Sequence, residues 1–242
     1  MSYNIGELSP LKRNWLFRNS NIPHRFLGLE PSDIERDNGS FPEEITEWVE
    51  SVLRGEVIKA IGGLGVTGVG LLFDGSPGLG KTTHAVTAIM EFIRNLPEDD
   101  EEARKILGAS SSDYGQALRP AYYLTFPEFL SKKKATFDAK GDERELLIAE
   151  MEGFHGRSKL DHLNVRILVL DDLGKEYGSK YDDSSFDEIL RSRYDKGLPT
   201  IITTNRDRED WEKVYGKAMG SFAFEAFHLV RLVGKDLRRE GQ

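Results

Sequence analysis

Residues 70–83 read G-L-L-F-D-G-S-P-G-L-G-K-T-T, and this stretch decides the fold. Gly75, Gly80, Lys81 and Thr82 satisfy the pattern G-x-x-x-x-G-K-[ST], in which glycines and a lysine surround nucleotide phosphates. The apolar run at 71–73 precedes the motif as a buried strand would. Apolar residues spaced for one helix face follow it over residues 85–93. The motif therefore stands in the order that it requires: strand, glycine loop, helix.

The loop offers the groups that a bound triphosphate needs. Glycines and Pro77 let successive backbone N–H groups point inward, and the following helix adds the positive end of its dipole. Lys81 is expected to reach the β- and γ-phosphates and the Thr82 hydroxyl to ligate Mg²⁺, so the predicted ligands are ATP and Mg²⁺. The predicted nucleotide-binding residues of the loop are Gly75, Ser76, Pro77, Gly78, Leu79, Gly80, Lys81, Thr82 and Thr83.

A second polar cluster is expected opposite this loop. The aliphatic run 165–170 ends in Asp171-Asp172, and the strand predicted over 200–203 leads to Asn205. In an ATPase site Asp171 would hold Mg²⁺, directly or through water, and Asp172 would polarise the attacking water. Asn205 can orient that water and sense the γ-phosphate. The predicted catalytic residues are Lys81, Asp172 and Asn205, and the predicted metal ligands are Thr82 and Asp171.

Composition excludes several classes of protein. The 242 residues are 38% apolar and 31% charged, as in a globular protein of one large or two small domains. No run approaches the roughly 20 apolar residues that cross a bilayer, the N-terminus lacks a signal-peptide core, and cysteine is absent, which fits a cytoplasmic location without a membrane partner. The net charge of −8 argues against strong non-specific binding to duplex DNA, although a local basic groove remains compatible with it.

Alternating apolar patterns predict a parallel sheet with helices between its strands. Strands are expected at 71–73, 121–124, 165–170, 200–203 and 229–233, and a loop at 173–183. Helices are expected at 42–59, 85–93, 101–107, 127–134, 142–154, 185–196 and 208–215. The candidate site residues all fall at carboxyl ends of strands, where nucleotide-binding sheets hold their ligands.

Together these stretches resemble the AAA+ ATPases of the DnaC/IstB type, the replicative helicase loaders and their transposition relatives. The blocks that carry the resemblance, besides the phosphate loop, are I-P-H-R-F at 22–26, Y-Y-L-T-F-P-E-F-L at 122–130, L-V-L-D-D-L-G-K-E at 168–176, I-L-R-S-R-Y-D-K-G-L-P-T-I-I-T-T-N at 189–205 and G-K-D-L-R-R at 234–239. The resemblance implies an α/β P-loop NTPase of the AAA+ (ASCE) class, with a five-stranded parallel sheet flanked by helices and a minimal or absent C-terminal lid. It implies a short partner-docking or flexible segment at 1–20 and an ATPase domain at 21–242.

The resemblance also assigns roles to residues. Lys81 and Thr82 match the Walker A pair, Asp171 and Asp172 the Walker B pair, and Asn205 the sensor I position. Residues that match the adenine-side segment are Ile22, Arg25 and Phe26. Residues that match the contacts to single-stranded DNA, or lie beside them, are Lys132, Lys133, Lys134, Phe137, Ser179 and Tyr181. Rings stack on bases and lysines follow the backbone, but a solvated lysine face and a core phenylalanine are equally open interpretations.

Two departures from the family pattern affect the functional prediction. Residues 220–227, where an arginine finger is expected, read G-S-F-A-F-E-A-F without an arginine. This predicts slow turnover or a substitute such as Arg191 or Arg193. Bacterial loaders also carry a separate helicase-binding N-terminal domain, whereas only residues 1–21 precede the match here. Either this short segment docks the helicase or the partner differs.

The expected function is ATP-dependent loading of a hexameric replicative helicase onto single-stranded DNA by a homo-oligomeric ring or helical assembly. One alternative is a transposase-partner ATPase that acts on duplex DNA. Another is a nucleotide-dependent protein-interaction module that barely hydrolyses ATP, which the missing arginine favours. The ATPase rate with single-stranded or duplex DNA, together with helicase capture, separates these alternatives.

Overall fold

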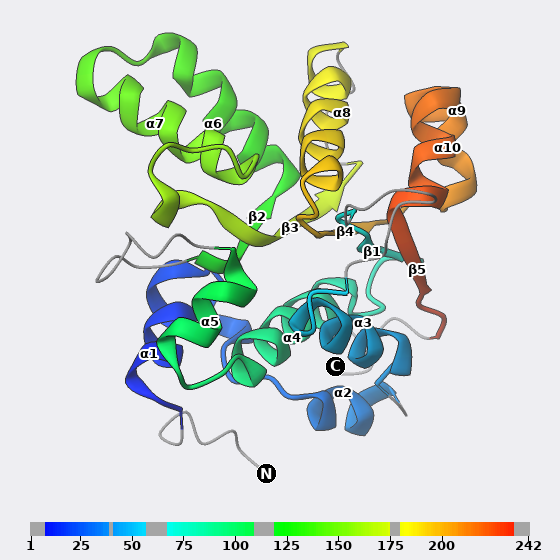
Figure 1. Ribbon diagram of the computed structural model, residues 1–242. Coiled ribbons are helices and arrows are strands. Elements are labelled where there is room, and N and C mark those ends of the chain that lie inside the picture. Colours follow the sequence, from blue (N-terminus) through cyan, green and yellow to red (C-terminus); the bar gives the residue numbers. More distant parts are fainter. Residues whose placement is uncertain (1–7, 39–40, 57–66, 109–118, 175–179, 235–242) are drawn as a thin grey trace.

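The computed structural model describes residues 8–38, 41–56, 67–108, 119–174 and 180–234. These residues form a five-stranded sheet with the spatial order β2-β3-β4-β1-β5, in which all neighbouring strands are parallel (Figure 1). The strands are β1 Gly70–Asp74, β2 Arg119–Thr125, β3 Val165–Leu173, β4 Thr200–Thr204 and β5 Phe227–Arg231. Strand β4 separates the strand of the phosphate loop from the strand of the acidic pair. The predicted fold class is therefore confirmed.

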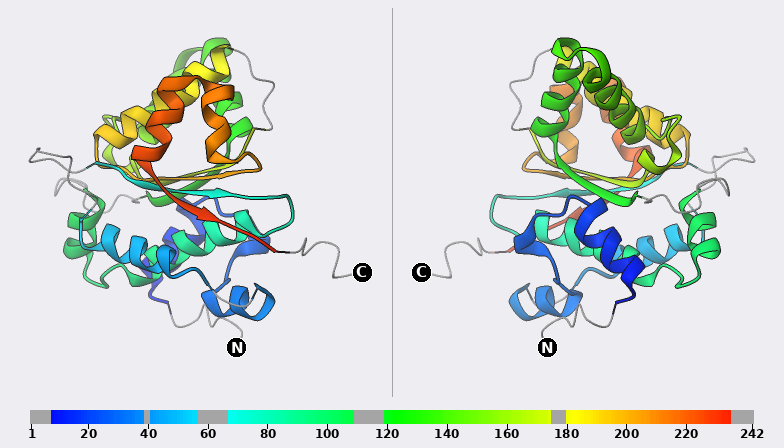
Figure 2. Two further views of the ribbon diagram at one scale, coloured as in Figure 1. Left: turned by 90° about the vertical axis from the view of Figure 1, so that its right-hand side faces the viewer. Right: turned by 90° about the vertical axis from the view of Figure 1, so that its left-hand side faces the viewer.

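Two layers of helices enclose the sheet (Figure 2). The lower layer in Figure 1 contains α1 Pro10–Asn14, α2 Pro31–Asn38, α3 Glu43–Leu53, α4 Lys81–Asn95 and α5 Asp100–Leu107. The upper layer contains α6 Phe126–Asp138, α7 Gly141–Phe154, α8 Lys180–Asp195, α9 Trp211–Tyr215 and α10 Lys217–Ala226. In the part of the chain that the structure describes, no helix is long and apolar enough to cross a membrane.

Alternating side chains of the central strands feed two separate cores. In β1, Leu71 and Phe73 pack with α4, whereas Leu72 packs with the upper helices. In β4, Ile201 joins the first core and Ile202 the second. Successive strand residues point to opposite faces, so a strand covered on both sides must be apolar at nearly every position. This explains why the strands read as continuous apolar runs.

Local signals place the helices that begin at the carboxyl ends of strands. Thr125 and Glu128 form a reciprocal capping box at the start of α6, where each side chain accepts a backbone N–H of the other residue at 3.3 and 2.9 Å. Helix α4 begins after Gly80, whose φ of 78° is readily accessible to glycine. Helix α6 consequently starts directly after β2 and continues to Asp138, beyond the helix predicted at 127–134.

Several boundaries differ from the sequence prediction. The loop expected over 173–183 is shorter, because Leu173 still belongs to β3 and α8 begins at Lys180. Strand β5 occupies Phe227–Arg231 instead of 229–233, since α10 ends at Ala226 and the chain enters the sheet at once. Helix α3 ends at Leu53, well before the predicted end at residue 59.

The described part of the N-terminal segment is packed onto the ATPase domain. Trp15 and Leu16 are buried in the lower core, and the Lys12 ammonium donates to the Arg94 carbonyl at 2.7 Å. The Ser20 carbonyl accepts the Tyr123 backbone N–H at 2.8 Å. Residues 8–20 are therefore packed in place, and docking of a partner by this segment stays a prediction. The domain boundary at residue 20 stays a prediction.

Candidate nucleotide-binding site

A cavity of about 500 Å³ opens at the carboxyl ends of β1, β3 and β4. Parallel strands bring their carboxyl ends to one edge of the sheet, so residues far apart in the sequence meet there. The lining residues are Arg25, Phe26, Pro77, Gly78, Gly80, Lys81, Thr82, Thr83, Asp172, Thr203 and Asn205. The cavity thus joins predicted residues of the adenine side, the phosphate loop and the catalytic set.

The phosphate loop curls around the tip of the Lys81 side chain. Gly75, Gly78 and Gly80 have φ values of 134°, 86° and 78°, in the region that favours glycine. The Lys81 Nζ donates to the carbonyls of Gly75 and Ser76 at 2.7 and 2.8 Å. A phosphate oxygen is a stronger acceptor for an ammonium than a neutral carbonyl. Lys81 is therefore held where an entering phosphate can take over its hydrogen bonds.

Asp171 is buried at the end of β3 and is surrounded by hydroxyl groups. Thr82 donates to its two carboxylate oxygens at 3.0 and 3.1 Å, and the Tyr123 hydroxyl donates at 2.6 Å. Thr203 on β4 donates a third hydroxyl. Burial, followed by the nearby Asp171 charge, raises the pKa of Tyr123, so that this hydroxyl keeps its proton and donates it to the hydrogen bond. Neither Tyr123 nor Thr203 is predicted from the sequence as a site residue.

The donor set fits one nucleotide-bound Mg²⁺. Thr82 and Asp171 were predicted as its ligands, and their oxygen atoms already lie within hydrogen-bonding distance of each other. Within the described ranges no group of three or more His, Cys, Asp or Glu residues could hold a metal ion. Mg²⁺ typically takes one or two protein oxygens and completes its octahedron with phosphate oxygens and water. The site therefore suits a metal that arrives with phosphates.

Asp172 points into the cavity because the backbone is irregular at this position. The register of β3 and β4 shifts between Leu170 and Leu173, and Asp172 adopts a φ of 61°. The Asp172 N–H donates to the Thr203 hydroxyl at 3.0 Å, which holds this conformation. Such conformations cost about 1–3 kcal/mol in non-glycine residues and cluster at functional sites. Asp171 consequently faces the interior, while its neighbour Asp172 lines the cavity.

Some predicted nucleotide-binding residues lie outside the lining of the cavity. Ile22 is buried and packs in the lower core, unlike Arg25 and Phe26 of the same segment. Leu79 is also buried in that core, although its loop neighbours line the cavity. Leu79 therefore anchors the loop in the lower core, and Ile22 belongs to the same core without lining the cavity.

The predicted DNA-contact residues come from two helices that meet above the sheet. Phe137 of α6 is 67% exposed, and its ring centroid lies 6.3 Å from that of Tyr181 in α8. The ammonium groups of Lys133 and Lys134 lie 5.6 and 5.5 Å from the Tyr181 ring. Ser179 lies outside the described residues. The structure thus assembles an aromatic pair flanked by lysines from separate parts of the sequence.

These lysines already have acidic partners. Lys132 pairs with Glu150 at 2.9 Å, Lys133 with Glu188 at 2.8 Å and Lys134 with Asp182 at 3.3 Å. A phosphate backbone would have to compete with these carboxylates for the ammonium groups. The aromatic pair is therefore the stronger feature of this surface.

The two candidate substitutes for the arginine finger differ. Arg193 is fully buried, and all five of its N–H groups donate to acceptors within the protein. It cannot reach a neighbouring subunit, so its assignment as a trans-acting arginine is corrected. Arg191 remains a candidate: its side chain is 41% exposed, pairs with Asp187 at 2.7 Å and lies 4.6 Å from the Phe222 ring centroid.

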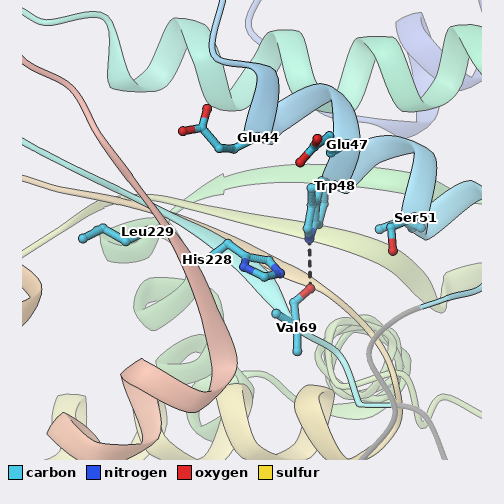
Figure 3. A pocket seen from close by; sticks show the side chains of 8 residues that line it. Glu44, Glu47, Trp48, Ser51, Val69, His228 and Leu229 are labelled. Carbon is cyan, nitrogen blue, oxygen red and sulfur yellow. Dashed lines mark hydrogen bonds between the residues drawn. The ribbon is translucent and has the colours of Figure 1, made fainter.

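A second cavity, of about 330 Å³, lies between α3 and β5 (Figure 3). Trp48 forms its wall and donates its indole N–H to the Val69 carbonyl at 3.0 Å. Among the described residues that line it there is no lysine or arginine, and Glu44 and Glu47 stand at its rim. A triphosphate would meet acidic groups here, so this cavity does not compete with the first as the nucleotide site.

Comparison with known proteins agrees with the geometry. Residues 139–231 match the family described as IstB-like ATP binding protein. The replicative helicase loader DnaC of Escherichia coli (strain K12) is 25% identical over 146 residues, which is 60% of this chain and 46% of that protein. The match therefore spans about half the length of the curated relatives.

Two solved structures share the fold. The crystal structure of the DnaC helicase loader has a TM-score of 0.53 at 21% identity and covers 87% of this chain and 100% of that chain. The crystal structure of DnaI has a TM-score of 0.53 at 20% identity, with coverage of 88% and 96%. The expected resemblance to DnaC/IstB-type AAA+ ATPases is confirmed.

Proposed function

We propose that this chain is a Mg²⁺-dependent ATPase that loads a hexameric replicative helicase onto single-stranded DNA. One observation carries the ATPase assignment: residues of the phosphate loop and Asp172, near the end of β3, line one cavity. Beside it the Thr82 hydroxyl oxygen lies 3.0 Å from an Asp171 carboxylate oxygen. Similarity to helicase loaders over 60% of the chain supports the helicase and DNA part of the proposal.

The proposed reaction is in-line attack of water on the γ-phosphate. Lys81 and the loop N–H groups bind the phosphates, and Mg²⁺ held by Thr82 and Asp171 would neutralise charge on their oxygens. Asp172, which faces the cavity, accepts a proton from the attacking water, and Asn205 orients that water. Tyr123 and Thr203 position the Asp171 carboxylate by hydrogen bonding.

Single-stranded DNA is proposed to contact the aromatic pair Phe137 and Tyr181. Aromatic rings stack on bases without sequence preference, and here Phe137 is exposed while Tyr181 is half-buried beside it. The adjacent lysines would exchange their acidic partners for phosphates. A homo-oligomeric ring or helix would bring a second subunit to the nucleotide cavity. Arg191 is the proposed arginine from that subunit, since its side chain is partly exposed.

Two alternatives each have an observation in their favour. The match of residues 139–231 to IstB-like proteins favours a transposition ATPase that acts on duplex DNA. The absence of arginine from residues 220–227 favours an interaction module that binds ATP but hydrolyses it very slowly.

The test is the steady-state ATPase rate of the purified protein alone, with single-stranded DNA and with duplex DNA, together with capture of a replicative helicase. The proposal predicts stimulation by single strands and helicase capture that depends on ATP. Stronger stimulation by duplex DNA would support the transposition role. ATP binding without turnover under every condition would support the interaction module.

A further inference from the structure

A buried carboxylate that pairs with a partly exposed arginine lies directly before the phosphate loop. Asp74, the last residue of β1, is 0% exposed, and its carboxylate accepts two hydrogen bonds from Arg231 of β5, at 3.0 Å from Nε and 2.7 Å from Nη2. The backbone N–H of Arg208 donates a third bond at 3.3 Å. A buried carboxylate is tolerated only when it is paired in this way. Asp74 therefore fixes the Arg231 guanidinium and the Arg208 backbone relative to β1.

The same residue joins the phosphate loop to the end of β5. The Asp74 carbonyl accepts the Leu232 N–H at 3.0 Å. At the next position, a Cβ added to Gly75 would lie 2.5 Å from the Leu232 carbonyl oxygen. The chain leaving β5 is thus packed against the first residue of the loop so closely that only glycine fits.

The ion pair also reaches the loop that carries Asn205. Asn205 lines the nucleotide cavity, and its loop leads directly into the 3-10 helix Arg208–Asp210, whose first N–H is bound to Asp74. The Arg231 guanidinium contacts the Glu209 carboxylate at 2.8 Å and approaches Asp207 at 4.0 Å. One side chain therefore links the buried carboxylate below the phosphate loop to two acidic residues that follow Asn205.

We propose that Arg231 is a positioning residue which, through Asp74 and Glu209, fixes the Asn205 loop against the phosphate loop and so determines how strongly the site prefers ATP to ADP. This inference rests on the proposed ATPase function. ATP and ADP share the α- and β-phosphates that the glycine loop binds, but only ATP offers a γ-phosphate to Asn205. Loosening the Asn205 loop weakens ATP binding more than ADP binding.

If Arg231 affects ATP binding through the Asn205 loop, ATP binding must also affect Arg231. If the position of the Asn205 loop depends on Arg231, then contact of Asn205 with a γ-phosphate stabilises the arrangement of Arg231 and Leu232 by the same free energy. The end of β5 is therefore expected to be held more firmly with ATP than with ADP.

The experiment compares ATP and ADP dissociation constants by calorimetry, with a non-hydrolysable ATP analogue. Glu209→Gln removes only the exposed link, and Arg231→Gln removes every link that the guanidinium makes, while the bond from the Arg208 N–H to Asp74 stays in place. The double variant Asp74→Asn/Arg231→Gln eliminates both charges, so that no buried carboxylate is left unpaired. The matched control is Arg157→Gln, because Arg157 also bridges two acids, Glu152 and Glu188, and its side-chain exposure of 40% is close to the 43% of Arg231.

We expect the affinity for the ATP analogue to fall about tenfold in Arg231→Gln and in the double variant, and less in Glu209→Gln. ADP affinity should stay within about twofold, and Arg157→Gln should change neither affinity. Equal loss of ATP and ADP affinity, or an unchanged ratio in all variants, would overturn the inference alone. Failure of the unmodified protein to bind either nucleotide would overturn the proposed function and this inference together.

Discussion

The two ends of the parallel sheet use charged residues in opposite ways. At the amino ends of β3 and β4, Arg193 donates to the carbonyls of Phe154, Val165, Arg166 and Pro199 and to the Thr200 hydroxyl, at 2.6–3.1 Å. Burial lowers the pKa of this guanidinium to about 9. At the carboxyl ends, Lys81, Asp172 and Asn205 line a cavity of about 500 Å³.

The two ends of the sheet differ in the hydrogen-bond partners of their polar side chains. All five Arg193 donors find acceptors inside the protein, so this end of the sheet is complete by itself. At the other end, Asp172 is held in a left-handed conformation that turns its carboxylate toward the cavity. A charged residue in the sequence therefore identifies a ligand site only when its partners are known. Substitutions at the two ends should separate stability from activity.

The largest effect is expected at the carboxyl end, from Asp172→Asn. An amide cannot accept a proton from water, so kcat for ATP hydrolysis should fall by about 10²- to 10⁴-fold. ATP affinity and the midpoint of thermal unfolding should stay close to those of the unmodified protein. Phosphate-release kinetics measures kcat, titration calorimetry the ATP affinity, and scanning calorimetry the unfolding midpoint. Normal hydrolysis by Asp172→Asn would mean that another residue activates the water.

At the amino end, Arg193→Met is expected to have the opposite effect, a loss of stability without a loss of ATP affinity. Removing the guanidinium leaves several buried carbonyls without donors, which should lower the free energy of unfolding by about 3–5 kcal/mol. The fraction that remains folded should bind ATP with unchanged affinity. Urea unfolding followed by circular dichroism gives the stability.

Arg157→Met serves as the control for Arg193→Met. Arg157 forms only partly exposed ion pairs, so its removal should lower stability by less than about 1 kcal/mol. If Arg193→Met were as stable as this control but lost ATPase activity, the assignment of Arg193 to folding would be wrong.

The smallest effect is expected from Tyr123→Phe, which deletes one hydroxyl donor to Asp171. Asp171 keeps the Thr82 and Thr203 hydroxyls, so the site should persist with a less firmly oriented carboxylate. The Mg²⁺ concentration for half-maximal ATPase activity should rise, by up to about tenfold. Tyr122→Phe, one residue earlier on the opposite face of β2, should leave this requirement unchanged.

The carboxyl end was largely predictable from sequence. The glycine loop, the acidic pair and Asn205 each follow an apolar strand, and parallel topology then brings them together. The hydroxyl groups around Asp171 were not predictable, because Tyr123 and Thr203 lie on neighbouring strands and reach Asp171 only through the sheet register. The irregular backbone at Asp172 likewise depends on its bond to Thr203, which no local pattern reveals.

The amino end and the N-terminal segment show where local reasoning fails. The sequence offers Arg193 as a candidate trans-acting arginine, yet its partners come from α7, β3, β4 and the turn before β4. Trp15 was placed in a docking or flexible segment, but it is buried in the lower core. Burial of a long side chain depends on contacts distant in the sequence.

Calorimetric titration of ATP into the unmodified protein and into Lys81→Ala, at millimolar Mg²⁺, shows whether the glycine loop binds a triphosphate. The account predicts one saturable site in the unmodified protein and loss of detectable binding in Lys81→Ala, with Lys105→Ala as a folded control on the surface of α5. Absence of ATP binding by the unmodified protein, or equal binding by Lys81→Ala, would contradict the claim that a triphosphate lies between the glycine loop and the acidic pair.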